Sequence, residues 1–150
     1  MIAHWGFDND VIQLVSDLTG EIADFGRCRA LAVLRSDNML VAGLIFHNWR
    51  PKAGVIEVSA AAIDPRWATR GVLQKALSYA YDDCGCQMVF ARTSESNTRT
   101  RRLWKALGAT EIILPRMGGR RASDALLCLT DDAWGQSSFM KSRQVYHRKR

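Results

Sequence analysis

The sequence lacks any apolar run close to the about eighteen residues that a membrane-spanning helix needs. Near its first residue it also lacks the charged and then apolar pattern of a secretory signal, so we expect a cytoplasmic protein with no membrane partner. Cysteine is scarce, and only Cys84 and Cys86 lie close together. Their spacing is too short for a zinc knuckle and no histidine is nearby, so we predict reduced thiols and no metal site.

Acidic residues are in deficit, with 15 Asp and Glu against 21 Lys and Arg, a net charge of +6 and a pI near 9.5. The basic side chains gather at 99–105, 116–121 and 143–150. Such charge favours an acidic partner, either a nucleotide or an acidic protein face, although a solvated surface is the simpler alternative. No helix-turn-helix, RNA-recognition or zinc-finger pattern is present, so we do not expect sequence-specific nucleic-acid binding. Nonspecific binding through the basic end stays open.

The hydrophobic pattern predicts strands and helices in one domain over 1–136, followed by a basic tail over 137–150. The expected helices are 8–18, 71–80 and 97–107, and the expected strands are 29–34, 39–49, 54–63, 87–91, 110–114 and 125–129. Gly43 predicts a bulge in the second strand. This order implies a mixed α/β sheet with a central parallel pair formed by 54–63 and 87–91.

The stretch 60–73 carries the strongest local signal. A strand of small apolar residues meets a break at Pro65, then a basic loop, and then a helix that opens at 69–71. The N-terminus of a helix presents free backbone N–H groups, which form a site for anions. Arg66 and Arg70 add positive charge beside those amides. The junction therefore suits a phosphate or pyrophosphate group.

This junction resembles the motif Arg/Gln-x-x-Gly-x-Gly/Ala of the GNAT superfamily of N-acyltransferases, with Arg66 at the first position and Gly71 at the last. Thr69 stands where the family has its first glycine. The later stretch 97–109 resembles the family pattern Asn-x-x-Ala-x-x-Leu-Tyr-x-x-Leu-Gly-Phe; Asn97, Leu103, Leu107 and Gly108 match it, whereas Trp104 replaces Tyr and Ala109 replaces Phe. The resemblance implies a mixed, mostly antiparallel sheet with a central splayed parallel strand pair, flanked by helices.

The resemblance also implies acetyl-CoA as co-substrate and an amine as acceptor. The pantetheine arm of acetyl-CoA would run along 61–63 and meet Asn97 on its other side. The pyrophosphate would lie on the backbone amides of 66–71. The implied binding residues are thus Ala61, Ala62, Ile63, Arg66, Trp67, Ala68, Thr69, Arg70, Gly71 and Asn97.

Glu57 is the first candidate for the general base, because several members of the family carry a catalytic glutamate at this place in the strand. A surface carboxylate paired with an arginine is the alternative for Glu57. His47 is the second candidate, because its ordinary pKa lies near neutrality; a structural role is the alternative. Trp104 occupies the position of the family's acid and can donate a hydrogen bond but cannot titrate.

Two functions are compatible with the resemblance. The first is an N-acetyltransferase that acts on an amine of a protein or small molecule. The second is a GNAT-fold protein that has lost turnover and binds CoA or an acidic partner, as the changes at Thr69 and Trp104 and the basic residues Arg99, Arg101 and Arg102 suggest. Residues 65–70 look like those of small bacteriophage members, which would place the protein in an infected host's cytoplasm. The sequence does not show the oligomeric state; a homodimer is one alternative, since dimers are common among such proteins.

Overall fold

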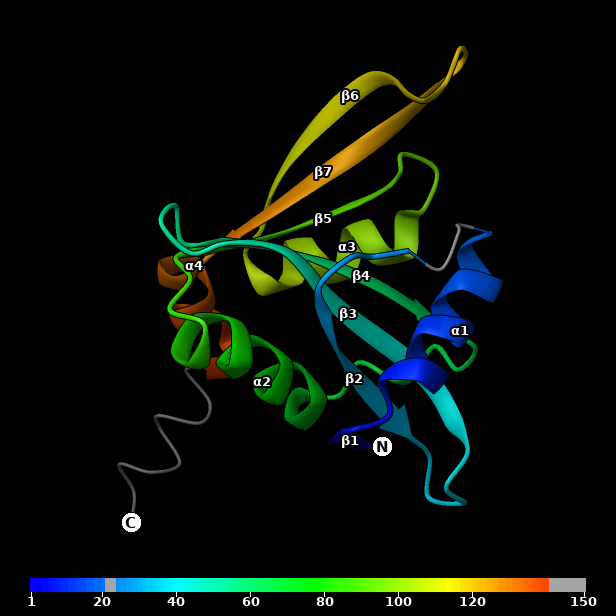
Figure 1. Cartoon of the computed structure of the whole chain (residues 1–150). Helices are drawn as coiled ribbons and strands as arrows, with labels where there is room; N and C mark the ends of the chain where they lie inside the picture. Colours follow the sequence, from blue (N-terminus) through cyan, green and yellow to red (C-terminus); the bar gives the residue numbers. More distant parts are fainter. Residues whose placement is uncertain (21–23, 141–150) are drawn as a thin grey trace. The chain divides into compact units, whose positions relative to one another are not determined.

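The computed structural model describes residues 1–20 and 24–140, and these form two compact units (Figure 1). The first unit comprises residues 1–85 and the second begins at Cys86. Each unit is described by itself. The predicted boundary at residue 136 stays a prediction, and 141–150 of the predicted tail lie outside the described residues.

The first unit is a four-stranded antiparallel sheet with two helices. Its elements are β1 (Ile2–Trp5), α1 (Asp8–Thr19), β2 (Cys28–Leu34), β3 (Leu40–Arg50), β4 (Val55–Ala62), α2 (Arg70–Ser78) and the π-helical turn η1 (Tyr79–Asp83). The strands lie in the order β1-β2-β3-β4, each antiparallel to the next. The predicted helices and strands of this unit are confirmed to within a few residues, and β1 is an addition that the sequence pattern did not reveal.

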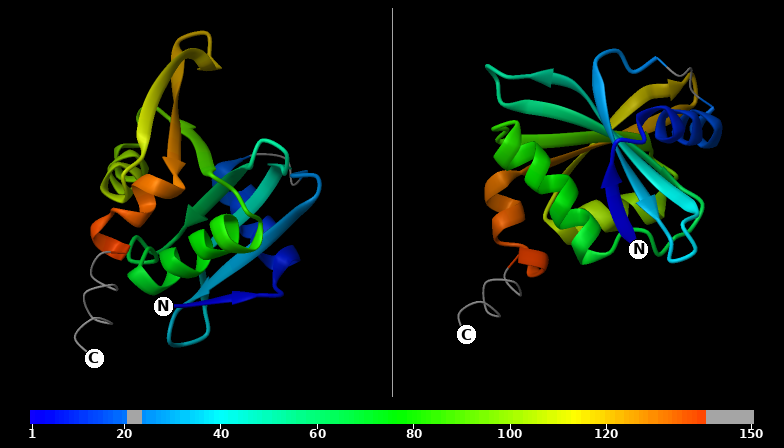
Figure 2. Two further views of the ribbon diagram at one scale, coloured as in Figure 1. Left: turned by 90° about the vertical axis from the view of Figure 1, so that its left-hand side faces the viewer. Right: turned by 60° about the horizontal axis from the view of Figure 1, so that its bottom comes forward.

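The core on one face of this sheet forms where α1 packs on β2 and β3 (Figure 2). Val11 and Val15 of α1 are fully buried among small residues of the two strands. A Cβ atom at Gly43 would lie 2.4 Å from Cγ1 of Val11, so the close approach of α1 requires glycine there. The predicted bulge at Gly43 is wrong, because the register runs evenly through this residue. In the pairing of β3 with β4, the register shifts instead between His47 and Arg50.

Aromatic side chains and two basic side chains hold β1 in place. The Trp5 ring lies 4.9 Å from that of Tyr79, and the Arg29 guanidinium lies 4.2 Å above Trp5. Lys75 of α2 donates a hydrogen bond of 2.8 Å to the carbonyl of Ala3. Burial, followed by a hydrogen bond with Cys84, raises the pKa of Tyr79 to about 12. A four-residue strand is too short to show a periodic pattern, which explains why the sequence did not predict it.

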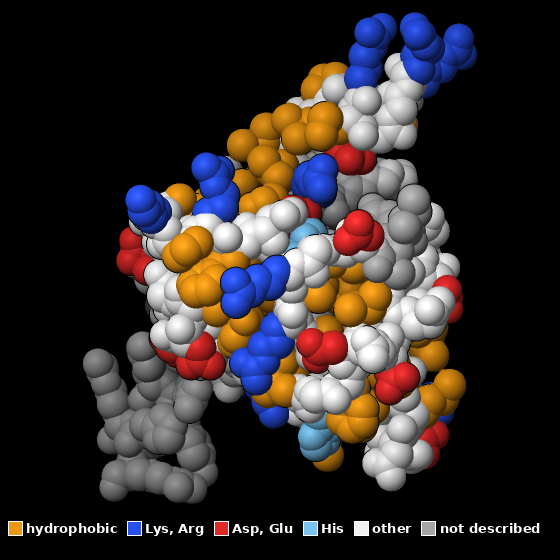
Figure 3. Space-filling model, in the orientation of Figure 1, with side chains coloured by type: hydrophobic (Ala, Val, Ile, Leu, Met, Phe, Trp, Pro, Cys, Tyr) orange, Lys and Arg blue, Asp and Glu red, His pale blue; other side chains and the backbone are white. Residues whose placement is uncertain are grey.

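The second unit is a three-stranded antiparallel sheet with one long and one short helix. Its elements are β5 (Met88–Ser94), α3 (Thr98–Leu107), β6 (Thr110–Gly119), β7 (Ala122–Thr130) and α4 (Asp131–Gly135), with the strands in the order β5-β7-β6. The hairpin of β6 and β7 extends well beyond the predicted strands 110–114 and 125–129. Its tip carries the exposed Arg116, Arg120 and Arg121 (Figure 3).

The predicted fold class is confirmed, because the seven strands are mostly antiparallel and helices flank them in a mixed α/β arrangement. The two strands that we expected as the parallel pair are β4 and β5. They belong to the first and the second unit respectively.

Candidate active site

The two candidate bases face each other on neighbouring strands of the first unit. His47 of β3 is the register partner of Glu57 of β4, and Nε2 of the imidazole lies 3.9 Å from Oε2 of the carboxylate. The residues are only 6% and 4% exposed, so Glu57 is not a surface carboxylate and that alternative is wrong. The residues considered separately in the sequence therefore form one buried pair.

Two further polar side chains complete this pair. Asn48 donates a hydrogen bond of 2.9 Å from Nδ2 to Oε1 of Glu57, and His47 Nε2 lies 2.8 Å from Oγ of Ser59. The ring of Phe25 packs edge-on against the imidazole, with centroids 5.3 Å apart. Neither Asn48 nor Ser59 was predicted, because a lone asparagine near a strand end has no sequence signature. We call these four polar residues the Glu57 cluster.

The Glu57 cluster has the chemistry of a general base. Carboxylate and imidazole nitrogen both accept protons, and both stand in a site from which bulk water is largely excluded. Electrostatic interactions are stronger in such surroundings than in water. An ammonium group within hydrogen-bond reach of Oε2 could therefore pass its proton to the protein.

The junction between β4 and α2 is the second part of the site. Its tight shape comes from Asp64, which accepts hydrogen bonds from the backbone N–H of Arg66 at 2.9 Å and from the Arg66 guanidinium at 3.0 and 3.1 Å. Arg66 thereby holds the pKa of Asp64 at about 2. The N–H groups of Trp67 and Thr69 donate within the loop, to the carbonyls of Asp64 and Trp67. The amides of Arg66, Trp67 and Thr69 are therefore engaged by the loop itself.

Three backbone N–H groups of this junction have no acceptor within the described part of the chain, namely those of Ala68, Arg70 and Gly71. Thr69 begins α2 as its N-cap, with Oγ1 accepting from the N–H of Val72. Its φ of −72° shows that this position needs no glycine, so the departure from the family motif leaves the loop intact.

Gly71 supplies one of these three N–H groups. A Cβ atom there would have no neighbour within 4 Å, so the glycine leaves open space at the start of α2 rather than fitting a crowded core. Along β4, Ala61 and Ala62 pair with Gly43 and Ala42 of β3, and Ile63 is about half exposed. The predicted binding residues of the first unit thus form one continuous stretch from strand to helix.

The predicted residues of the second unit lie at the start and on the body of α3. Asn97 is the N-cap, as predicted: Oδ1 accepts from the N–H of Thr100 at 3.2 Å, and Nδ2 donates to Oγ1 of Thr93 at 3.0 Å. Its contact with pantetheine stays a prediction. Trp104 is half-buried on the same helix.

Part of the basic surface of α3 is neutralised within the second unit. Arg101 and Lys105 both form ion pairs with Glu111, the second at 3.1 Å. Arg101 in particular holds the pKa of Glu111 below its ordinary value. Of the three arginines considered for an acidic partner, Arg101 is therefore already paired, whereas Arg99 and Arg102 are exposed.

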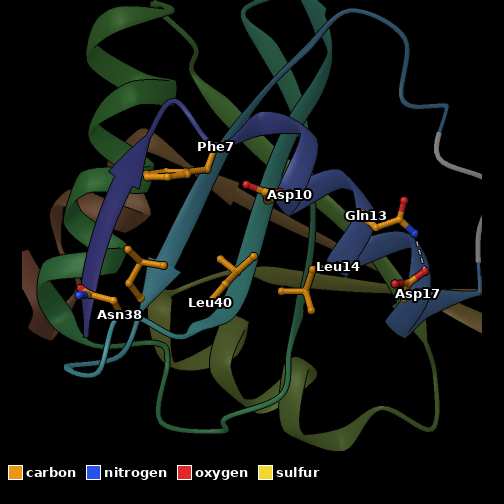
Figure 4. Close-up of a pocket in the computed structure, with 8 residues that line it drawn as sticks. Phe7, Asp10, Gln13, Leu14, Asp17, Asn38 and Leu40 are labelled. Atoms are coloured by element: carbon orange, nitrogen blue, oxygen red, sulfur yellow. Dashed lines mark hydrogen bonds between the residues drawn. The ribbon is translucent and has the colours of Figure 1, made fainter.

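A separate cavity of about 680 Å³ lies in the first unit beside α1, between this helix and the turn that joins β2 to β3 (Figure 4). Its lining combines leucines with polar residues of α1, and it contains none of the predicted site residues; it is lined by Phe7, Asp10, Gln13, Leu14, Asp17, Leu34, Asn38 and Leu40. Over 1–20 and 24–140 there is no cluster of three metal-ligating side chains, and no helix is long and apolar enough to cross a membrane.

Comparison with known proteins identifies the family. Residues 7–109 match the model of the acetyltransferase (GNAT) family. The chain belongs to this GNAT family. No curated protein matches the sequence. The match spans both the Glu57 cluster and the junction at the start of α2, so the two parts of the candidate site lie within the GNAT region.

Solved structures of GNAT acetyltransferases share the fold. Mutant forms of the spermidine/spermine N-acetyltransferase SpeG from Vibrio cholerae superpose with a TM-score of 0.72 at 11% identity, over 89% of this chain and 96% of the other. A dodecameric spermidine N-acetyltransferase from the same organism gives 0.70 at 12% identity, over 91% and 97%. At these identities the likeness concerns the fold.

Proposed function

We propose that this GNAT protein transfers an acetyl group from acetyl-CoA to a primary amine, with Glu57 as general base. The observation that carries the proposal is the buried pair of Glu57 and His47, two groups that can accept protons and that lie within the region matching the family. The carboxylate is tolerated in this buried place because Asn48 donates a hydrogen bond to it. The closeness of a carboxylate and an imidazole away from bulk water supports a role in proton transfer.

The reaction begins with removal of a proton from the acceptor. An alkylammonium with a pKa near 10.4 requires about 4–5 kcal/mol to become neutral at pH 7. Oε2 of Glu57 takes this proton, and the amine nitrogen then attacks the thioester carbonyl carbon. The carbon–sulfur bond breaks and CoA leaves as a thiolate, which takes up the second proton of the attacking nitrogen. One proton is therefore released for each amide formed from an ammonium acceptor. A thiol with a pKa near 8.5 is a tolerable leaving group, so Trp104 need only donate a hydrogen bond.

The start of α2 would hold the pyrophosphate of acetyl-CoA. The amides of Ala68, Arg70 and Gly71 are the donors left for it, and the partial positive charge of the helix start adds to them. Arg70 supplies the mobile cation, because Arg66 is already held by Asp64. Ala61, Ala62 and Ile63 with Asn97 would flank the pantetheine arm. Holding both substrates in one place can contribute about 7–11 kcal/mol to the rate, more than the base itself.

The acceptor that we would test first is an aliphatic polyamine. The support is the similarity of fold to spermidine N-acetyltransferases. The phage-like character of residues 65–70, the cytoplasmic location and the homodimer stay predictions.

The proposal is tested first by thermal unfolding with and without acetyl-CoA. At a hundred times its dissociation constant, a ligand of the native state adds about 2.7 kcal/mol, which raises Tm by roughly 5–11 °C for a domain of this size. Gly71→Leu should abolish the rise. Gly135→Leu is the matched control, because Gly135 also has no neighbour within 4 Å and lies in α4. If acetyl-CoA leaves Tm unchanged, the enzyme assignment fails.

The second candidate is a protein that binds CoA without turnover, and Trp104 in place of the family's tyrosine is the observation that favours it. Trp104→Tyr discriminates between the two. A large gain in acetyl transfer to a polyamine would show that only the acid is missing, whereas no turnover in either form, with a normal Tm rise, would favour the binding protein.

A further inference from the structure

The backbone of β3 is irregular where it passes Glu57, and it is irregular again near Leu40, where it pairs with β2. From His47 to Arg50 the chain takes three steps while β4 takes two, from Glu57 to Val55, so one extra residue is inserted as a β-bulge. Within this bulge Asn48 has a φ of +51°, in the left-handed region that most side chains avoid. Bulges commonly re-aim a side chain beside an active site.

The effect of this bulge is to bring Asn48 onto the carboxylate. In a regular strand, neighbouring side chains point to opposite faces of the sheet. Here His47 and Asn48 are adjacent in sequence, and both reach Glu57. Without the extra residue, the Asn48 amide would point to the other face.

The two carboxylate oxygens consequently have different surroundings. Oε1 accepts the hydrogen bond from Nδ2 of Asn48 at 2.9 Å. Oε2 lies 3.9 Å from His47 Nε2, and that nitrogen is itself held by Oγ of Ser59 at 2.8 Å. Asn48 thus holds one oxygen of the carboxylate, and Ser59 holds the imidazole from outside the pair.

We propose that Asn48 is a positioning residue, which anchors Oε1 of Glu57 and so fixes the orientation of the carboxylate that takes the amine proton. This inference rests on the proposed function, in which Glu57 is the base. Asn48 acts only through Glu57 and does not touch a substrate. A fixed carboxylate needs no reorientation at the moment of proton transfer.

A purely conformational role for Asn48 is the competing explanation, because asparagine is one of the few residues that tolerate positive φ. The substitution Asn48→Gly separates the two roles, since glycine adopts this φ freely but has no amide. Asn38→Gly is the matched control: Asn38 has a φ of +64° in the exposed turn between β2 and β3 and does not contact the Glu57 cluster.

The kinetic test is steady-state acetylation of the best amine acceptor. We expect Asn48→Gly to lower kcat roughly tenfold to a hundredfold, the usual range for losing a hydrogen bond to a charged group. The KM for acetyl-CoA should stay unchanged, and Asn38→Gly should behave as the wild type. Wild-type kcat in Asn48→Gly would overturn the inference.

A double variant adds a readout that a structural role would not produce. If Asn48 acts only through Glu57, Asn48→Gly should cause no further loss of kcat in a Glu57→Gln background. An equal loss in both backgrounds would show that Asn48 acts elsewhere and would overturn the inference.

A third readout does not depend on activity. In ¹H–¹⁵N spectra the Asn48 side-chain amide should show one hydrogen-bonded, downfield proton that moves upfield in Glu57→Gln, while the Asn38 amide stays unchanged. An Asn48 amide that does not respond overturns the inference. Absence of acetyl transfer by the wild type, by contrast, would contradict the proposed function alone.

Discussion

The polar side chains of the two units have different kinds of partner. In the first unit His47, Glu57 and Asp64 are buried, and each has polar partners at short range. In the second unit α3 has a single buried residue, Leu107, and Arg101 and Lys105 of this helix form ion pairs with Glu111 of β6, whose side chain is only 9% exposed. These cations lower the pKa of Glu111, whereas Glu57 has Asn48 and His47 among its neighbours. We therefore place the proposed proton transfer in the first unit.

The N-termini of α2 and α3 also differ, in how their N-cap side chains use their polar atoms. Thr69 and Asn97 are both N-caps, and both occupy positions of the family motifs. Thr69 uses one oxygen and leaves three nearby amides without an acceptor in the described chain. Asn97 uses both ends of its side chain locally. The start of α2 therefore leaves N–H donors for the anion that we propose to bind there, whereas the Asn97 side chain is engaged at the start of α3.

The largest expected effect comes from neutralising one carboxylate in each unit. Glu57→Gln keeps an oxygen for Asn48 but removes the proton acceptor, so kcat should fall about 10²- to 10⁴-fold while the Tm rise with acetyl-CoA persists. Glu111→Gln weakens the ion pairs with Arg101 and Lys105, so it should lower Tm with little change in kcat. Steady-state kinetics and thermal unfolding of both variants check this. Equal losses of kcat would remove the distinction between the units.

The next largest effect concerns packing. Gly43→Ala places a methyl group 2.4 Å from Val11 Cγ1, which α1 can relieve only by moving away from β3. We expect a loss of about 1–3 kcal/mol in the free energy of unfolding, as is usual for overpacking. Gly135→Ala in α4 of the second unit meets nothing within 4 Å and should be close to neutral. Urea unfolding measures both; a neutral Gly43→Ala would mean that α1 is packed more loosely than the structure shows.

The caps provide a smaller comparison. Replacing an N-cap residue by alanine typically lowers stability by about 1 kcal/mol. Asn97→Ala loses the bond to Thr93 as well as the cap, so it should lower Tm more than Thr69→Ala does. The acetyl-CoA-dependent rise in Tm should persist in Thr69→Ala, because the three amides remain. The reverse order of Tm values would contradict the roles given to these caps.

The sequence predicted those features that depend on periodicity or on a motif. Strands β2 to β4, helices α1 to α3 and the mixed α/β class follow from hydrophobic spacing, whereas α4 was not predicted. Glu57 followed from the family resemblance, and His47 from the ordinary pKa of histidine. The short β1 has no period of its own, since it is held by tertiary contacts with Tyr79 and Lys75. The strands predicted for the β6–β7 hairpin were too short, because its residues, such as the exposed Met117, show no alternation between buried and exposed positions.

The Glu57 cluster shows why a site is harder to predict than a fold. The register that places His47 opposite Glu57 depends on how two strands pair, and the contact with Asn48 depends on a single inserted residue. Shifting a strand by one residue turns its side chains to the other face. Sequence alone selected Glu57 and His47 as candidates but did not reveal that they are partners, nor that Asn48 and Ser59 contact them.

The smallest effect at neutral pH is expected for Asp64→Asn in the first unit. Its partner Arg66 has a side chain that is 80% exposed, so solvent screens the ion pair and limits its contribution. The native pKa of Asp64 is about 2, below the value of about 3.9 in an unfolded chain. The ion pair therefore stabilises the fold above about pH 4 and loses this contribution as the pH falls towards 2. Denaturant unfolding of the wild type and Asp64→Asn at pH 7, 4 and 2.5 should show a difference that shrinks steadily, and a difference independent of pH would mean that the charge of Asp64 does not hold the loop.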